Sequence, residues 1–377
     1  MEPTADRSES PSLAAIAVLG ASGLTGRAVT AELARRDHRV VAAAPDPDRV
    51  RTVLDQEGLA DSGIEVRAAA AGSPGSLDDL LGDVDLVIAL AAPYLEYGQA
   101  VLDAALRAGV HYLDAALEPP FVARVHSQDA RARRAGCVLV SAGGFPGALL
   151  DLLAGSAVGA VTGPDGVHLA TTFPSRGGVR AGAGATTRAV LADLLAQPME
   201  TLVDGELVSE PVGEARRLAW FPRPVGLAHA AGVPGSGHLS VPRHAPQVPT
   251  VREYLALSGW KAEVLQLAGN ATRWAGPRRT LHRVVAGGAP PTSPATGDRV
   301  RWACVAETRG DEGVARAWAN GRNPVDTTGA ALAVLAEAVL ADPCAGVRAP
   351  AELAPPHELL DRLSARRELR WSLIRPG

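Results

Sequence analysis

The first 140 residues alternate between short apolar runs and stretches whose apolar positions recur with helical spacing. The apolar runs cover residues 14–20, 39–44, 64–70 and 85–91, and two shorter ones follow Gly109 and Gly136. Glycine after a helical stretch marks the end of a helix. Strands and helices that alternate with short connections predict an α/β domain, a doubly wound parallel sheet with helices on both faces.

The turn after the first apolar run, GASGLTG, has glycines at positions 20, 23 and 26. In a dinucleotide-binding unit the first glycine makes a tight turn, the second lets the backbone approach a pyrophosphate, and the third lets helix and strand pack closely. The pyrophosphate then lies on the free N–H groups and positive dipole end of the helix that begins near Leu24. Residues 13–150 are therefore predicted to form a Rossmann-type dinucleotide-binding domain.

The composition and the hydrophobic pattern of the chain change after residue 150. Segments rich in Gly, Pro and Arg alternate with strand-like runs such as VHLATTF and RVRWACVAE. This pattern predicts a second, mixed α+β domain over residues 151–325. Residues 326–377 contain helical runs at 327–341 and 357–371, which we expect to return to the first domain. Residues 1–12 are polar, which is typical of a disordered tail rather than a signal peptide.

Charge and cysteine content narrow the class of protein. The net charge is −4, with acids and arginines interspersed, which argues against a nucleic-acid or membrane partner. No apolar run is long and unbroken enough to cross a membrane. The three cysteines lie far apart and the histidines near residue 240 have no third ligand, so neither a disulfide framework nor a metal site is expected. These features favour a cytoplasmic protein.

Three segments carry a resemblance to a known family: AAPYLEYG (91–98), AGVHYLDAALEPPFV (108–122) and VLVSAGGFPGALLDLLA (138–154). With the C-terminal NPVDTTGAALAVLAEAVL and AGVRAPAEL, they are similar to the saccharopine dehydrogenase-like family, which includes saccharopine reductases and trans-acting enoyl reductases. The resemblance implies an NAD(P)-dependent oxidoreductase with a small-molecule or carrier-bound substrate held between the two domains. It also implies that residues 151–325 bind the substrate and form the interface of a homodimer.

The resemblance also implies roles for individual residues. Pro93 and Tyr94 would line the nicotinamide end of the cofactor, and His111, Tyr112 and Asp114 would stand at a strand end facing the inter-domain cleft. Such a placement agrees with the rule that ligands bind at the carboxyl ends of the strands in open α/β sheets. The expected catalytic residues are Tyr94, His111, Tyr112 and Asp114. The expected cofactor-binding residues are Gly20, Ser22, Gly23, Leu24, Thr25, Gly26, Asp46, Arg49, Ala92, Pro93 and Glu118. The expected substrate-binding residues are Tyr97, Phe145, Arg176, Arg180 and Arg188.

Two positions depart from the family pattern. Pro45 stands after the second strand, where the family often has an arginine that pairs with an adenosine 2′-phosphate. Asp46 follows at the distance where an acid hydrogen-bonds a 2′-hydroxyl, although Arg49 is close by, so NAD and NADP both remain open. The second departure is the segment GFPGALLDL, which retains Asp151 but lacks the earlier acid of the family pattern GFDxxPxDL.

Two other classes of Rossmann-fold enzyme require catalytic residues that this sequence lacks. A short-chain dehydrogenase uses a Tyr-x-x-x-Lys pair, but the single lysine, Lys261, has Leu257 four places before it. A semialdehyde reductase needs a nucleophilic cysteine after the nucleotide domain, where this chain has SAGGFPGA. A non-redox isomerase, cyclase or nucleotide-binding scaffold remains an alternative, because fold does not fix function. The favoured reaction is reduction of a C=C or C=N bond in a biosynthetic, specialised-metabolism substrate.

Overall fold

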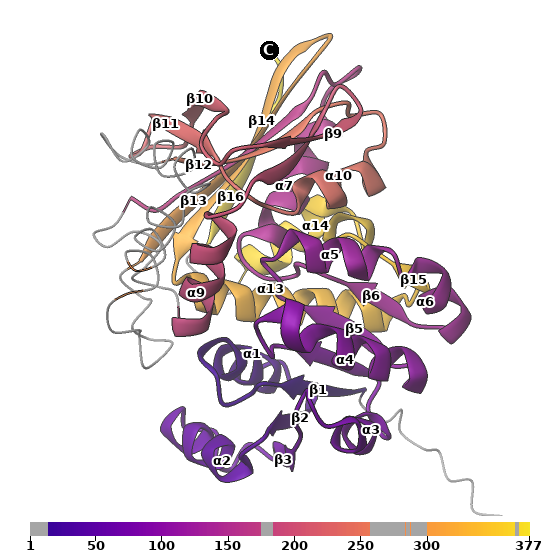
Figure 1. Ribbon diagram of the computed structural model, residues 1–377. Coiled ribbons are helices and arrows are strands. Elements are labelled where there is room, and N and C mark those ends of the chain that lie inside the picture. Colours follow the sequence, from indigo (N-terminus) through magenta and orange to yellow (C-terminus); the bar gives the residue numbers. More distant parts are fainter. Residues whose placement is uncertain (1–13, 175–183, 257–282, 284–286, 288–299, 366–368) are drawn as a thin grey trace, which may run out of the picture.

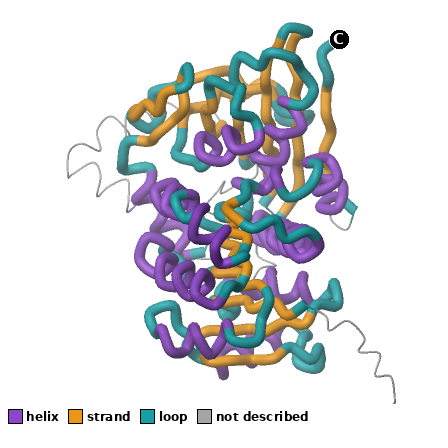
Figure 2. Tube along the Cα trace, turned by 90° about the vertical axis from the view of Figure 1, so that its right-hand side faces the viewer, coloured by secondary structure: helices purple, strands orange, loops and turns teal. Residues whose placement is uncertain are grey.

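Two β-sheets with helices around and between them make up the protein (Figures 1 and 2). The computed structural model describes residues 14–174, 184–256, 283, 287, 300–365 and 369–377. The first sheet has seven strands in the order β15-β6-β5-β4-β1-β2-β3, and every pairing in it is parallel. Its strands are β1 (Ala15–Leu19), β2 (Arg39–Ala44), β3 (Glu65–Ala68), β4 (Leu86–Ala89), β5 (His111–Asp114), β6 (Val138–Val140) and β15 (Gly346–Val347).

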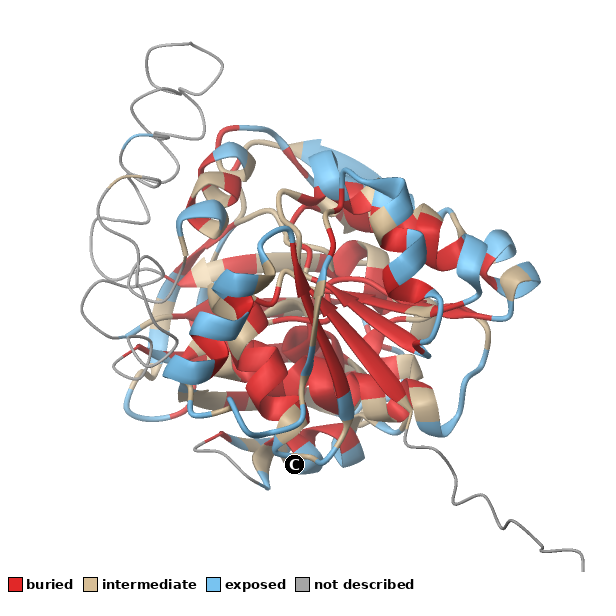
Figure 3. Ribbon diagram, turned by 90° about the horizontal axis from the view of Figure 1, so that it is seen from below, coloured by how far each residue is buried: buried red, intermediate tan, exposed pale blue. Residues whose placement is uncertain are grey.

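Alternate residues of these strands face two different apolar layers. Ile16 and Val18 of β1 point into one layer, which contains residues of α1, α2, α7 and α13. Ala17 and Leu19 point into the other layer, which contains residues of α3, α4, α5 and α6. Figure 3 shows the strands buried between these helices. The helices are α1 (Leu24–Ala34), α2 (Pro47–Gln56), α3 (Pro74–Leu81), α4 (Tyr94–Ala108), α5 (Pro119–His126), α6 (Asp129–Ala135), α7 (Gly147–Val158) and α13 (Pro324–Ala341). The predicted doubly wound sheet is confirmed.

The second sheet has nine strands and is mixed, as predicted. Strand β12 pairs with β7 in parallel, whereas β13, β14 and β16 follow β7 as antiparallel neighbours. Helix α7 carries the chain from the first sheet and packs against β13 and β14. The other elements are β7 (Val167–Thr172), α9 (Ala185–Leu194), β8 (Met199–Val203), β9 (Glu206–Glu210), β10 (Arg216–Trp220), β11 (Leu227–Gly232), α10 (Gly237–His244), β12 (Val251–Ala256), β13 (Arg301–Gly310), β14 (Gly313–Arg322), η2 (Pro350–Glu352), α14 (Pro356–Ser364) and β16 (Arg370–Ile374).

The C-terminal segment contributes to both sheets. Helix α13 crosses α1 so closely that a Cβ on Gly329 would lie 2.9 Å from the carbonyl oxygen of Ala28. Strand β15 extends the first sheet, and β16 pairs with β14 in the second. The predicted helix over residues 357–371 is wrong in its last part, because α14 ends at Ser364. Trp371 and Leu373 alternate with polar residues and pack on the core, which is the period of a strand.

An ion network fixes α13 beside the end of α1. Glu337 accepts hydrogen bonds from Arg36 Nη1 at 3.0 Å and from His38 Nε2 at 3.1 Å, and it also pairs with Arg362. Burial acts to raise the pKa of Glu337, but the hydrogen bonds from His38 and Arg36 outweigh it and lower the pKa to about 2. The network holds the helix that carries the glycine turn against the C-terminal segment.

Helix α13 is also long and apolar enough to cross a membrane by length and composition, which differs from the expectation that no run would reach that threshold. Its 18-residue window is 72% buried inside the protein. Its side chains pack on α1 and on the first sheet, as those of a core helix do.

Candidate functional site: the carboxyl edge of the parallel sheet

Two glycines of the turn after β1, Gly20 and Gly26, cannot be replaced by another residue without strain. Gly20 has φ +94°, the left-handed region that favours glycine, and a Cβ there would lie 2.8 Å from the Leu90 carbonyl oxygen. The N–H groups of Gly20 and Ala21 both donate to the carbonyl of Ala43, at 2.8 and 3.0 Å. The turn is therefore tied to the end of β2 on one side and packed on the end of β4 on the other.

The third glycine brings α1 against the turn. A Cβ on Gly26 would overlap the Gly20 carbonyl oxygen and lie 2.7 Å from Ala21 Cα. Gly23 is the N-cap of α1, and neither a capping side chain nor an acidic residue occupies the first turn of this helix. The leading N–H groups of Leu24 and Thr25 therefore remain for a ligand, and their dipole favours an anion. These residues fit a dinucleotide pyrophosphate.

The turn also lies where the strand order reverses. From β1 the chain proceeds to β2 and β3 on one side and to β4, β5 and β6 on the other. In open parallel sheets this reversal opens a crevice at the carboxyl edge, and ligands bind there. The ends of β4, β5 and β6 are thus where the nicotinamide half of a bound cofactor is expected.

Tyr94 joins the ends of two of these strands. It follows the cis peptide bond between Ala92 and Pro93 and begins α4. Its hydroxyl donates to the carbonyl of Ala89 at 2.9 Å and accepts from the N–H of Ala115 at 3.1 Å. The side chain is buried, and burial raises the pKa of its hydroxyl well above the ordinary value. Tyr94 is therefore engaged in linking β4 to β5.

Glu118 caps the helix that Tyr94 begins. Its Oε1 accepts from the N–H of Tyr94 at 2.8 Å and from that of Leu95 at 3.5 Å. The N-cap residue itself, Pro93, offers no capping side chain. Burial raises the pKa of Glu118, while the hydrogen bonds from Tyr94 and Leu95 act in the opposite direction. The sequence predicts that Glu118 binds the cofactor. Such a contact would use a carboxylate that already caps α4.

Asp114 closes the next loop in a similar way. Its carboxylate accepts from Ser141 Oγ at 2.9 and 2.8 Å, from Ala142 N at 2.9 Å and from Ala116 N at 2.9 Å. Burial raises the pKa of Asp114 to about 6 against the effect of these hydrogen bonds. Tyr112 is fully buried beside it, and burial raises the pKa of the Tyr112 hydroxyl well above its ordinary value.

His111 lies at the opposite end of β5 from the position expected. It is the first residue of the strand and pairs in register with Leu86, the first residue of β4. Its Nδ1 accepts the N–H of Val138 at 3.0 Å, and burial lowers the pKa of the ring. A strand rises about 3.3 Å per residue, so His111 is roughly 10 Å from the carboxyl end at Asp114. The predicted placement of His111 at the cleft is wrong, because the strand begins with it.

The predicted substrate residues lie on several elements. Tyr97 is exposed in the first turn of α4. Phe145 packs on Trp302 and Phe173, with ring centroids 4.9 and 6.0 Å apart, so β6, β7 and β13 meet there. Arg188 is buried on α9 and donates to the carbonyl of Gly287 at 3.1 Å. Two further candidates, Arg176 and Arg180, lie outside the described residues.

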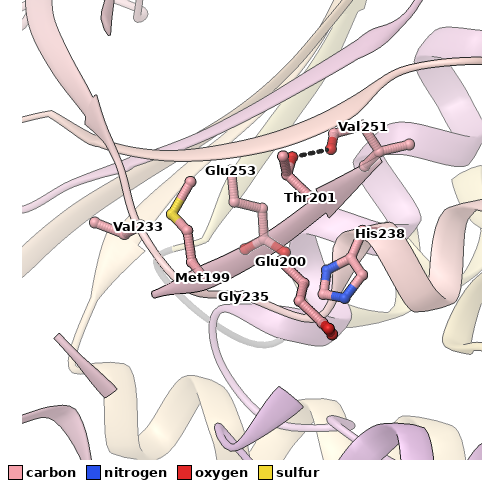
Figure 4. A pocket seen from close by; sticks show the side chains of 8 residues that line it. All are labelled: Met199, Glu200, Thr201, Val233, Gly235, His238, Val251 and Glu253. Atoms are coloured by element: carbon pink, nitrogen blue, oxygen red, sulfur yellow. Dashed lines mark hydrogen bonds between the residues drawn. The ribbon is translucent and has the colours of Figure 1, made fainter. Parts of the chain in front are cut away.

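A second polar group, which the sequence did not single out as a site, surrounds Glu253 (Figure 4). The pocket measures about 10 Å³, close to the smallest volume that holds one water molecule. Gly237 N donates to Glu253, and burial raises the pKa of this carboxyl to about 7. His238 Nε2 has no hydrogen-bond partner among the described residues. The described part of the chain contains no group of three or more His, Cys, Asp or Glu side chains arranged for a metal ion. The pocket is lined by Met199, Glu200, Thr201, Val233, Gly235, His238, Val251 and Glu253.

Comparisons with known proteins agree with this geometry. Residues 16–140 match the family described as "Saccharopine dehydrogenase NADP binding domain". A trans-acting enoyl reductase of Mycobacterium ulcerans (strain Agy99) is 31% identical over 101 residues, which are 26% of this chain and 24% of that protein. A saccharopine dehydrogenase-like oxidoreductase of Mus musculus is 28% identical over 152 residues, 36% of this chain and 35% of that protein. The chain thus spans about a quarter to a third of the length of these curated relatives.

The fold of the whole chain also has a solved counterpart. The apo saccharopine dehydrogenase (L-Glu forming) from Saccharomyces cerevisiae superimposes with a TM-score of 0.62 at 15% identity, over 96% of this chain and 100% of that one. The fold, the glycine turn and the match over residues 16–140 define the first domain as a Rossmann-type NAD(P)-binding domain. Residues 16–140 are similar to the NADP-binding domain of saccharopine dehydrogenases, which confirms the predicted resemblance and the predicted NAD(P) cofactor.

Proposed function

We propose that the protein transfers hydride between NAD(P) and a C=C or C=N bond of a small or carrier-bound substrate of specialised metabolism. One observation carries the proposal: the glycine turn and the uncapped start of α1 lie at the strand-order reversal of a parallel sheet. That arrangement fits the pyrophosphate of a dinucleotide, and it directs the rest of the cofactor along the carboxyl edge of the sheet.

The bound nicotinamide supplies the hydride, and the chain supplies position and enclosure. Backbone N–H groups of the turn would hold the pyrophosphate. Tyr94, Glu118 and Asp114 fix the loops after β4 and β5, against which the nicotinamide end would rest. We assign these three side chains to positioning, because their polar atoms already serve backbone groups inside the protein.

Support for the substrate class comes from two sources. The M. ulcerans relative is described as an enoyl reductase, which favours a C=C bond. On the side of the second sheet, Phe145 and Phe173 are partly exposed beside the loop after β6. Aromatic rings there suit an acceptor with an apolar body. We also propose a cytoplasmic homodimer formed through the second domain, without nucleic-acid or membrane partners, which rests on the resemblance and on the composition.

The proposal is tested by two measurements on the purified chain. Titration with NADH and NADPH, followed by nicotinamide fluorescence, should show saturable binding of at least one of them. Oxidation of the bound cofactor is then compared between a 2-enoyl thioester and an imine formed from an amine and an oxo acid. Failure to bind either dinucleotide would refute the proposed function. Binding without oxidation by either substrate would refute the proposed bond types.

A further inference from the structure

The end of β2 lies beside the glycine turn, where the adenosine ribose of a bound dinucleotide would rest. This inference rests on the proposed function, because it concerns the cofactor that the glycine turn would hold. The carbonyl of Ala43, in the penultimate position of β2, accepts two N–H groups from the turn. Asp46 follows three residues later, on the same edge of the sheet. The adenosine end of a dinucleotide bound at the turn would therefore lie beside Asp46.

The carboxylate of Asp46 is held in a fixed orientation. It is the N-cap of α2, and its Oδ1 accepts from the N–H of Asp48 at 3.1 Å and of Arg49 at 3.0 Å. The side chain is exposed, so the second oxygen can accept hydrogen bonds from a ligand without breaking the cap. A ribose with a free 2′-hydroxyl is a donor that matches this oxygen. A 2′-phosphate is an acceptor with like charge and does not match it.

Two arginines on α1 and α2 already have partners. Arg51 pairs with Asp48 at 2.7 Å. Arg27 donates its Nε to the carbonyl of Ser22 at 3.3 Å. Pro45 has neither charge nor N–H, so the residue directly after β2 offers nothing to a phosphate. Arg49 is exposed one turn into α2 and is the remaining candidate for a phosphate contact.

We propose that Asp46 makes this protein select NAD over NADP by accepting the ribose 2′-hydroxyl and repelling a 2′-phosphate. The family description names an NADP-binding domain, so the selection would set this chain apart from the cofactor in that description. Asp46 is thus the proposed specificity residue, and the contribution of Arg49, the remaining candidate for a phosphate contact, is tested separately.

The experiment measures the dissociation constants of NADH and NADPH for four forms of the full chain at one low and one moderate salt concentration. Wild type should bind NADH at least about tenfold more tightly. Asp46→Asn keeps an oxygen for the helix cap and removes the charge, so the preference should shrink by about fivefold or more. Arg49→Ala should leave the ratio of the two constants unchanged. Asp55→Asn, the same substitution at the exposed far end of α2, is the matched control and should also leave it unchanged.

Each alternative result has a definite meaning. Equal or tighter binding of NADPH by wild type overturns the inference while it supports the proposed function. A preference for NADH that survives Asp46→Asn unchanged overturns the role of Asp46. Loss of NADPH binding in Arg49→Ala would identify Arg49 as a phosphate ligand and contradict the proposed selection against the 2′-phosphate. Absence of binding for both dinucleotides overturns the proposed function, and this inference with it.

Discussion

Glu118 provides the sharpest test of whether the crevice residues act on the fold or on the cofactor. Replacing Glu118 by Ala leaves the buried N–H of Tyr94 without its acceptor at 2.8 Å. A hydrogen bond to a charged group contributes about 1.5–3 kcal/mol, and a carboxylate at a helix N-terminus contributes a further 0.3–1 kcal/mol or so. The burial that raises the pKa of Glu118 offsets part of this gain. We therefore expect the free energy of unfolding to fall by about 2–3 kcal/mol, measured by urea denaturation and circular dichroism.

Two further variants separate the possible roles. Glu118→Gln keeps a side-chain oxygen for the Tyr94 N–H and should recover most of the lost stability with cofactor affinity close to that of wild type. Glu96→Ala removes an exposed acid from the same first turn and should change stability by less than about 0.5 kcal/mol. The positioning role is refuted if Glu118→Ala unfolds like wild type but binds both dinucleotides at least tenfold more weakly, because the carboxylate would then act on the cofactor.

Three other predictions concern Gly26, His111 and Glu253. Gly26→Ala should abolish cofactor binding, because the added Cβ overlaps backbone of the turn, whereas Gly75→Ala, where a Cβ meets nothing within 4 Å, should bind normally; fluorescence titration distinguishes them. His111→Ala should leave cofactor affinity and turnover within about twofold of wild type and lower stability by about 1–2 kcal/mol, because the Val138 N–H loses its acceptor. Turnover reduced a hundredfold or so with unchanged binding would restore His111 as a catalytic candidate. The pKa of Glu253 is raised to about 7 in the folded protein, so its charge destabilises the fold increasingly as pH rises from about 4.5 through 7. Glu253→Gln should therefore be more stable than wild type above pH 7, by up to about 3 kcal/mol, and should lose this advantage near pH 4. Urea denaturation midpoints measured across this pH range test the prediction. A stability difference that does not change with pH would contradict the raised pKa of Glu253.

The cofactor half of the site could be predicted from the sequence because it depends on local chemistry. Gly26 is required by backbone contacts within a single strand-turn-helix unit, and Gly20 is required by the left-handed φ of +94° in the same turn. The apolar runs beside them specify the strands. The pairing of Glu118 with Tyr94 could not be predicted in this way. The two residues are 24 positions apart, and their contact depends on how β4 and β5 lie side by side. Glu253 was missed for a similar reason, because its surroundings come from β8, α10 and β12 together.

The placement of His111 shows that the HYLD motif predicts a strand but not which of its residues lie at the site. The segment HYLD specifies a strand, and alternation puts Tyr112 and Leu113 in different apolar layers. Its polar residues suggest a catalytic group. A strand of four residues, however, runs once from the amino edge of the sheet to the carboxyl edge, so its first and last residues lie at opposite edges. Of these four residues only Asp114 lies at the carboxyl edge, where its carboxylate already accepts hydrogen bonds from Ser141 and Ala142 of the loop after β6. A proton donor for the proposed reduction must then come from elements that the tertiary fold brings to this edge from elsewhere, such as the segment that carries Tyr97 or the second sheet beyond Phe145. Mutagenesis that starts from those elements will therefore reveal more about the chemistry than mutagenesis of the strand motif.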